Sequence, residues 1–146
     1  MNFQNSVKNC FQDKYADFSG RATRSEFWYF YLFLLLSYVL SIILIFFVSF
    51  KFFWVVAVFY LGIIIPSFAV TARRLHDVNK SGWLQIITFP TAFLMDFLER
   101  SNEIASGIFA LVTLGLYIYL FILYVSHGDK KDNRFGKNPY KKRKRK

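Results

Sequence analysis

FWYFYLFLLLSYVLSIILIFFVSFKFFWVVAVFYLGIIIPSFAVTA, Phe27 to Ala72, is the stretch that decides the fold, because Lys51 is its only charged residue. As one α-helix it would be about twice as long as the hydrocarbon core of a bilayer, which is roughly 30 Å thick. A single helix therefore does not fit a membrane. The stretch predicts two membrane spans, at about residues 27–50 and 52–72, joined by a tight hairpin at Lys51.

Two further apolar stretches follow along the chain. Residues 104–126 carry no charge and predict another span. Residues 83–98 are interrupted by Pro90 and carry Asp96, so they predict either a short span or a segment that enters the bilayer and returns. We expect an all-α integral membrane protein, a four-transmembrane-helix bundle with a short, Pro-broken third span.

The composition agrees with a membrane protein, since 55% of the residues are hydrophobic. The net charge of +10 does not predict a nucleic-acid partner, because ten of the nineteen Lys and Arg residues lie between positions 130 and 146. We therefore divide the chain into a cytoplasmic N-terminal segment (1–26), a membrane domain (27–126) and a basic cytoplasmic tail (127–146). The last residues, Tyr140 to Lys146, are expected to be disordered and to lie on anionic lipid.

The distribution of basic residues predicts the topology. If all four stretches cross, four basic residues before the first span, three in the central loop and ten in the tail lie on one side. Only Lys51 and Arg100 lie on the other side. Basic residues accumulate on the cytoplasmic side of short loops, so both termini are predicted to be cytoplasmic.

The stretch ARRLHDVNKSGW, Ala72 to Trp83, places charged residues at the end of the second predicted span. Arginines there complement the helix dipole, and Arg73 and Asp77 are spaced four apart for an ion pair. Asn79 or Gly82 can end the helix. These roles are structural. For a binding site, this stretch would need to meet other segments of the chain on the same side of the membrane.

Two such segments are FSGRATRSEFW, Phe18 to Trp28, and NRFGKNP, Asn133 to Pro139. The first contains Thr23 and Glu26 in the spacing of a capping box, so Glu26 is interpreted as a helix cap rather than a catalytic acid. Under the predicted topology, all three segments meet at one cytoplasmic face. Their arginines are therefore expected to form one cluster.

Taken in this order around the apolar stretches, the three segments resemble the domain of unknown function 805 family of small bacterial inner-membrane proteins, over about residues 15–139. The resemblance implies a helical protein of the bacterial cytoplasmic membrane with no established activity. The segment MDFLERSNE and the tail YKKRKRK depart from the family pattern. The positions that recur in the family correspond to Gly20, Arg21, Arg24, Phe27, Trp28, Arg73, Arg74, Leu75, His76, Asp77, Gly82, Trp83, Asn133, Arg134, Phe135, Gly136 and Pro139.

The function that these residues favour is binding without catalysis, to anionic lipid headgroups or to a protein partner. Arginine forks suit phosphate recognition better than lysines do. A membrane protein partner or a second copy of the chain is the alternative to lipid, and no nucleic acid is expected. The predicted binding residues are Arg21, Arg24, Arg73, Arg74, His76, Asp77, Trp83 and Arg134.

Two other classes of function remain open. A small transporter would need a charged residue inside the bilayer, and Asp96 is the only ionisable side chain in any of the four stretches. An interfacial enzyme could use His76 as general acid or base, with Asp77 orienting it or pairing with it. Because no metal-ligand spacing, dinucleotide fingerprint or phosphate-binding glycine loop occurs in the sequence, we expect no catalytic residue, metal or cofactor.

Overall fold

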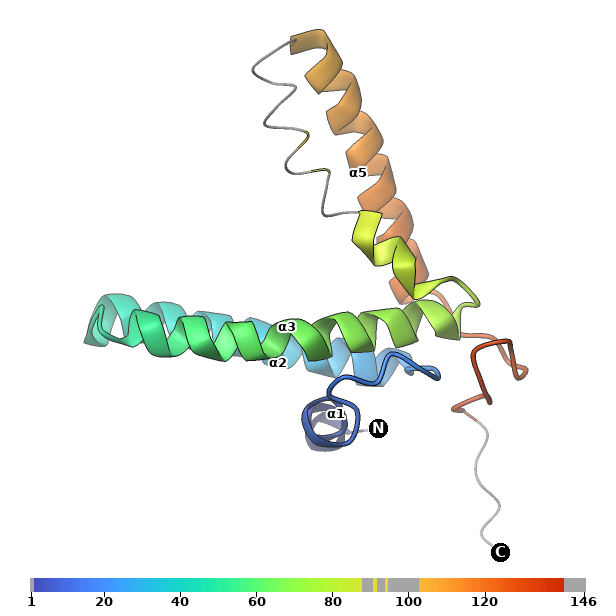
Figure 1. Ribbon diagram of the computed structural model, residues 1–146, viewed down its shortest axis with the longest axis horizontal. Helices are drawn as coiled ribbons and strands as arrows, with labels where there is room; N and C mark the ends of the chain where they lie inside the picture. The colour runs from blue at the N-terminus through green and yellow to red at the C-terminus, as the bar shows by residue number, and fades with distance from the viewer. Residues whose placement is uncertain (1, 88–90, 92–93, 95–102, 141–146) are drawn as a thin grey trace, which may run out of the picture.

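The computed structural model describes residues 2–87, 91, 94 and 103–140, and the regular elements among them are helical (Figure 1). A short helix α1 (Phe3–Lys8) continues into the π-helical segment η1 (Asn9–Asp13). The helix α2 (Arg24–Ile43) continues into a second π-helical segment, η2 (Leu44–Val48). The long helix α3 (Phe52–Asp77), the 3₁₀ segment η3 (Gly82–Ile87) and the helix α5 (Glu103–Val125) complete the list.

Three of these helical stretches are long and apolar enough to cross a membrane: Arg24–Val48, Phe52–Asp77 and Ile104–Val125. They correspond to the predicted spans at 27–50, 52–72 and 104–126. Most of the predicted third span, 83–98, lies outside the described residues, and its first residues belong to η3. The fourth crossing and the break at Pro90 therefore stay predictions.

The helices α2 and α3 form an antiparallel hairpin and lie side by side (Figure 1). The turn is closed by backbone hydrogen bonds from Ser49 to Leu44 and from Phe52 to Ser49. Along the hairpin, the hydroxyls of Tyr31 and Thr71 are 2.8 Å apart. Hydrogen bonds of this kind help to hold helices together in lipid, where apolar burial gives no preference for protein over lipid.

The helix α3 continues past the apolar run as far as Asp77. It ends in a Schellman arrangement, in which Lys80 N–H donates to Leu75 O and Asn79 N–H donates to His76 O. Asn79 has φ of 58°, a left-handed conformation that asparagine tolerates better than most residues. Of the two residues expected to end the helix, Asn79 and Gly82, it is Asn79 that does so.

The N-terminal segment packs on the hairpin, and α1 crosses α2 and α3 instead of running along them (Figure 1). The Phe11 ring lies 5.6 Å from the Phe30 ring and 5.5 Å from the Phe33 ring. Tyr15 donates a hydrogen bond of 2.6 Å to Gly62 O, a carbonyl without a helical partner because residue 66 is proline. The segment is thereby fixed to both helices.

The helix α5 diverges from the hairpin and approaches α3 near its own C-terminal end (Figure 1). Most of its apolar side chains are exposed, with Ile104 at 77% and Leu111 at 71%. The described helices thus form a hairpin and a diverging third helix. The four-transmembrane-helix bundle predicted from the sequence is not confirmed.

Candidate functional site

At the end of α3, the buried carboxylate of Asp77 is shared by two arginines, Arg74 from the same helix and Arg21 from another segment. Arg21 Nε donates to Asp77 Oδ1 at 2.9 Å, and Arg74 Nη1 donates to Asp77 Oδ2 at 2.5 Å. All three side chains are 0% exposed. Arg21 comes from the loop before α2, so this contact joins segments that are 56 residues apart.

A second buried ion pair forms on the α2 side of the same helix. Arg73 Nη1 donates to Glu26 Oε1 at 2.7 Å, and Asn9 donates to the same oxygen at 2.8 Å. The expected pairing of Arg73 with Asp77 is therefore wrong, because Arg73 points toward α2 and Asp77 toward the C-terminal segment. We call Arg21, Glu26, Arg73, Arg74 and Asp77 the buried ion cluster.

The capping-box prediction is correct in one half. Glu26 N–H donates to Thr23 Oγ1 at 3.2 Å, so the threonine caps α2 as expected. The Glu26 carboxylate does not return to Thr23, because Arg73 and Asn9 hold it. Glu26 is a partner in an ion pair rather than a cap.

The buried ion cluster also holds the chain that follows α5. Arg74 donates to the carbonyls of Tyr124 (3.1 Å) and Ser126, which lie at the end of α5, where backbone acceptors lack helical partners. Arg21 donates to the carbonyls of Asp129 (2.6 Å) and Lys131 (2.8 Å). Residues 127–140, predicted as tail, are therefore folded against the end of α3.

Two residues of this C-terminal segment fit closely on Asp77. A Cβ atom at Gly128 would lie 1.9 Å from Asp77 Oδ2, so no larger residue fits there without a shift of the chain. The Tyr140 hydroxyl donates to the same oxygen at 3.1 Å. Burial raises the pKa of the Tyr140 hydroxyl, and the charge of Asp77 raises it further, so the hydroxyl keeps its proton.

His76 contacts the C-terminal segment through its ring. The ring stacks on Phe135 with centroids 3.9 Å apart, and the Arg134 guanidinium lies 4.7 Å from the Phe135 centroid. His76 Nδ1 is 3.1 Å from Gly20 O, and since a carbonyl only accepts, Nδ1 carries the proton of this bond. Asp77 is held by arginines instead, so the two residues do not form the acid–base pair considered from the sequence.

The predicted site residues thus fall into two groups. Arg21, Arg73 and Arg74 are buried and have internal acceptors, so they leave no side-chain surface for a phosphate. Arg24 is partly exposed, and its side chain donates to the Val125 carbonyl at 3.5 Å. Arg134 and Trp83 are exposed, Trp83 at 76%.

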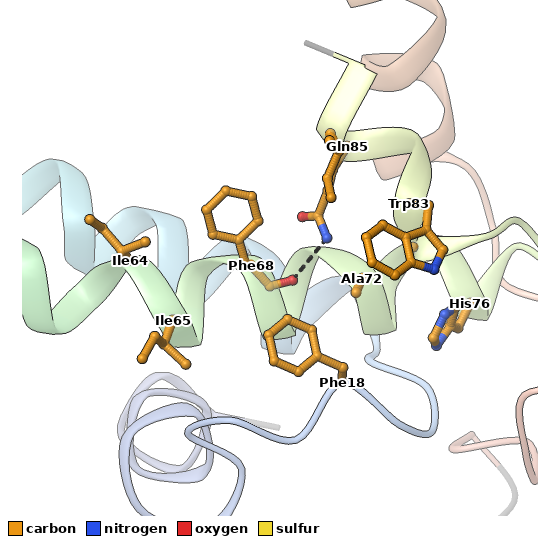
Figure 2. A pocket seen from close by; sticks show the side chains of 10 residues that line it. Phe18, Ile64, Ile65, Phe68, Ala72, His76, Trp83 and Gln85 are labelled. Atoms are coloured by element: carbon orange, nitrogen blue, oxygen red, sulfur yellow. Dashed lines mark hydrogen bonds between the residues drawn. The ribbon is translucent and has the colours of Figure 1, made fainter. Parts of the chain in front are cut away.

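Next to the cluster lies an apolar pocket of about 500 Å³ (Figure 2). Its walls come from α3, from η3 and from Phe18 in the loop before α2. Close packing of η3 on α3 needs Gly82, because a Cβ atom there would lie 2.7 Å from Ala72 Cβ. Gln85 Nε2 donates to Phe68 O at 3.3 Å and fixes η3 from the other side.

The sequence did not indicate the contacts of Gly128 and Tyr140 with Asp77, and it indicated a capping role for Glu26 rather than its pairing with Arg73. Their contacts join positions that are distant in the chain, so no local spacing signals them. No group of three or more metal-ligating His, Cys, Asp or Glu side chains occurs within the described part of the chain.

Residues 15–137 match the model of one protein family, whose description is "Protein of unknown function (DUF805)". No curated protein and no solved structure matches the chain. The match covers α2, α3, α5 and the buried ion cluster.

Proposed function

The chain belongs to the DUF805 family, and we propose that it is a non-catalytic protein of the bacterial inner membrane that binds anionic lipid headgroups at its cytoplasmic face. The observation that carries this proposal is the docking of residues 127–140 on the buried ion cluster. The buried arginines act as scaffold in this proposal. The binding groups are the cations that the scaffold presents.

The cations concerned are exposed side chains near the end of α3, which we call the rim cations. They lie in the turn after α3 and in the C-terminal segment: Lys80, Lys130, Lys131, Arg134 and Lys137. Residues 127–140 contain two acidic residues, Asp129 and Asp132, against four basic ones, and six more basic residues follow in sequence. This face therefore carries a net positive charge.

A positive face beside a membrane span has a nearby source of anions in the lipid headgroups. Each Lys or Arg near an anionic leaflet contributes about 1 kcal/mol of attraction, which salt screens. Trp83 is 76% exposed beside this face, as is typical of tryptophan at a membrane interface. Both features support lipid as the partner over a soluble protein.

Titration of the purified full-length protein with fluorescent phosphatidylglycerol and phosphatidylcholine tests the proposal. The variant K80Q/K131Q/R134Q/K137Q should bind phosphatidylglycerol about tenfold or more weakly, because four charges of about 1 kcal/mol each are partly screened. Lys51→Gln, at the tip of the hairpin, is the matched control. Equal binding of both lipids, or an unchanged affinity of the fourfold variant, would refute the proposal.

The proposal includes the topology, with four crossings and both termini in the cytoplasm. It is supported by the distribution of basic residues and by the three helices that can span a bilayer. Single cysteines placed at positions 51, 80, 102 and 146 of a Cys10→Ala chain can be labelled from either side of the membrane. Labelling of position 102 from the cytoplasm alone would show that residues 83–98 do not cross.

A further inference from the structure

The pocket beside η3 is a site separate from the rim cations. It extends along α3 from Ile64 to His76, which at 1.5 Å per residue is about 18 Å (Figure 2). A cavity of this length and a volume of about 500 Å³ is narrow. Ile64 lies in the middle of the candidate span Phe52–Asp77, so one end of the pocket reaches the depth of the lipid chains.

The lining is apolar except near His76. Phe18, Phe68 and Trp83 supply aromatic surfaces, and Ile64 and Ile65 supply the far wall. The amide of Gln85 is bonded to the backbone of α3. Binding pockets for small molecules commonly combine an apolar lining with very few polar groups, which fix the orientation of the ligand.

His76 provides such a polar group. Its Nδ1–H donates to Gly20 O, so in the neutral ring Nε2 is an acceptor with a free lone pair. Nε2 faces the pocket side, because a Cβ atom built on Gly82, which lines the pocket, would lie 3.3 Å from it. None of the residues that the structure describes forms a hydrogen bond with Nε2. Stacking on Phe135 fixes the direction of this acceptor.

From these features we infer that the pocket binds a neutral membrane amphiphile, with its chain along α3 toward Ile64 and a hydroxyl at its head donating to His76 Nε2. The acceptor requires a head that donates a proton, and a neutral hydroxyl meets this requirement, whereas an ester or ether head has no proton to donate. A chain-like body follows from the narrow apolar shape. A long-chain monoacylglycerol has this chemistry.

The test uses Trp83 as a reporter, in the full-length chain with Trp28→Phe and Trp54→Phe, reconstituted in phosphatidylcholine nanodiscs. A monoacylglycerol brominated on its chain should quench Trp83 fluorescence saturably. The methyl ester of the same brominated acid lacks the hydroxyl and should bind about fivefold more weakly, the ratio that corresponds to about 1 kcal/mol for one neutral hydrogen bond.

Two variants test the two ends of the pocket separately. His76→Phe removes the acceptor and keeps an aromatic ring for stacking, so it should abolish the preference for the hydroxyl probe. Ile65→Phe lies at the lipid-facing end, away from His76, and adds no second tryptophan, and it should weaken both probes by filling part of the pocket. Equal binding of hydroxyl and ester probes to the parent chain, or no saturable quenching, would overturn the inference. The rim cations have no part in this outcome, because both probes are uncharged.

Discussion

Replacing Asp77 by alanine should strongly destabilise the protein. The Asp77 carboxylate is 0% exposed and accepts hydrogen bonds from Arg21, Arg74 and Tyr140. Removing one partner of a buried ion pair typically costs about 3–5 kcal/mol, because the other charge stays buried without compensation. Here two guanidinium groups lose their carboxylate but keep carbonyl acceptors, so we expect a loss of about 4 kcal/mol.

Asp129→Ala is the matched control, because it keeps the backbone contacts of Asp129 with the cluster and removes a carboxylate that no arginine of the cluster contacts. Asp129 is partly exposed and its carboxylate accepts one hydrogen bond, from Asn133 at 3.2 Å. Asp129→Ala should lower the free energy of unfolding by about 1 kcal/mol or less. Asp77→Asn keeps the shape and one acceptor oxygen but removes the charge, so its loss should lie between those of the two alanine variants.

Cys10 provides the assay. It is the only cysteine of the chain, and it is 0% exposed in the core between α1 and the hairpin. Its alkylation at rising fractions of a denaturing detergent reports unfolding of the region where the N-terminal segment packs on the hairpin. A midpoint for Asp77→Ala no lower than that for Asp129→Ala would refute the structural role of the cluster. An unchanged midpoint for Asp77→Asn would show that charge pairing is not the cause.

Three further predictions use the same purified protein. Gly128→Ala should destabilise the protein by about 1–3 kcal/mol, because the added methyl group would overlap with Asp77. Gly115→Ala is the control: no atom lies within 4 Å of its Cβ position, so it should be neutral or stabilise by up to about 1 kcal/mol. An equal effect of both variants on the alkylation midpoint would contradict the close fit of Gly128. Tyr15→Phe should lower the free energy of unfolding by about 1 kcal/mol. The loss should be smaller in a Pro66→Ala background, because the restored amide of residue 66 can donate to Gly62 O; an equal loss in both backgrounds would refute the role of Pro66 in freeing this carbonyl. Burial raises the pKa of the Cys10 thiol from 9.0 to about 11, and the charge of Glu26 adds to this shift. The folded protein therefore favours the protonated thiol, so the stability that this thiol contributes is present below pH 9 and is lost between pH 9 and about 11. Midpoints measured across that range should fall as pH rises, and a flat profile would contradict the raised pKa.

The helices long and apolar enough to span a membrane were predictable from sequence, because the hydrocarbon core disfavours charged side chains along the whole length of a span. The runs 27–50, 52–72 and 104–126 contain no charge, and the helices found there are long and apolar enough to span a bilayer. The ends were less predictable. The helix α3 continues to Asp77 because its charged side chains find buried partners and do not require water at the end of the apolar run.

The partners inside the cluster were not predictable, because they depend on contacts between distant segments. Local spacing favours an ion pair between Arg73 and Asp77. In the folded chain Asp77 instead pairs with Arg21 and Arg74, and Arg73 pairs with Glu26. The three segments were correctly expected to come together. The direction of each arginine determines whether it can meet a ligand, and sequence does not contain that direction.

Binding of anionic lipid at the rim cations is measured most directly by native mass spectrometry of the protein extracted with its own membrane lipids. The wild-type chain and Lys51→Gln should retain anionic phospholipids above their proportion in the membrane, and K80Q/K131Q/R134Q/K137Q should lose that enrichment. Retained lipids in the proportions of the bulk membrane, or equal enrichment in all three proteins, would contradict the account.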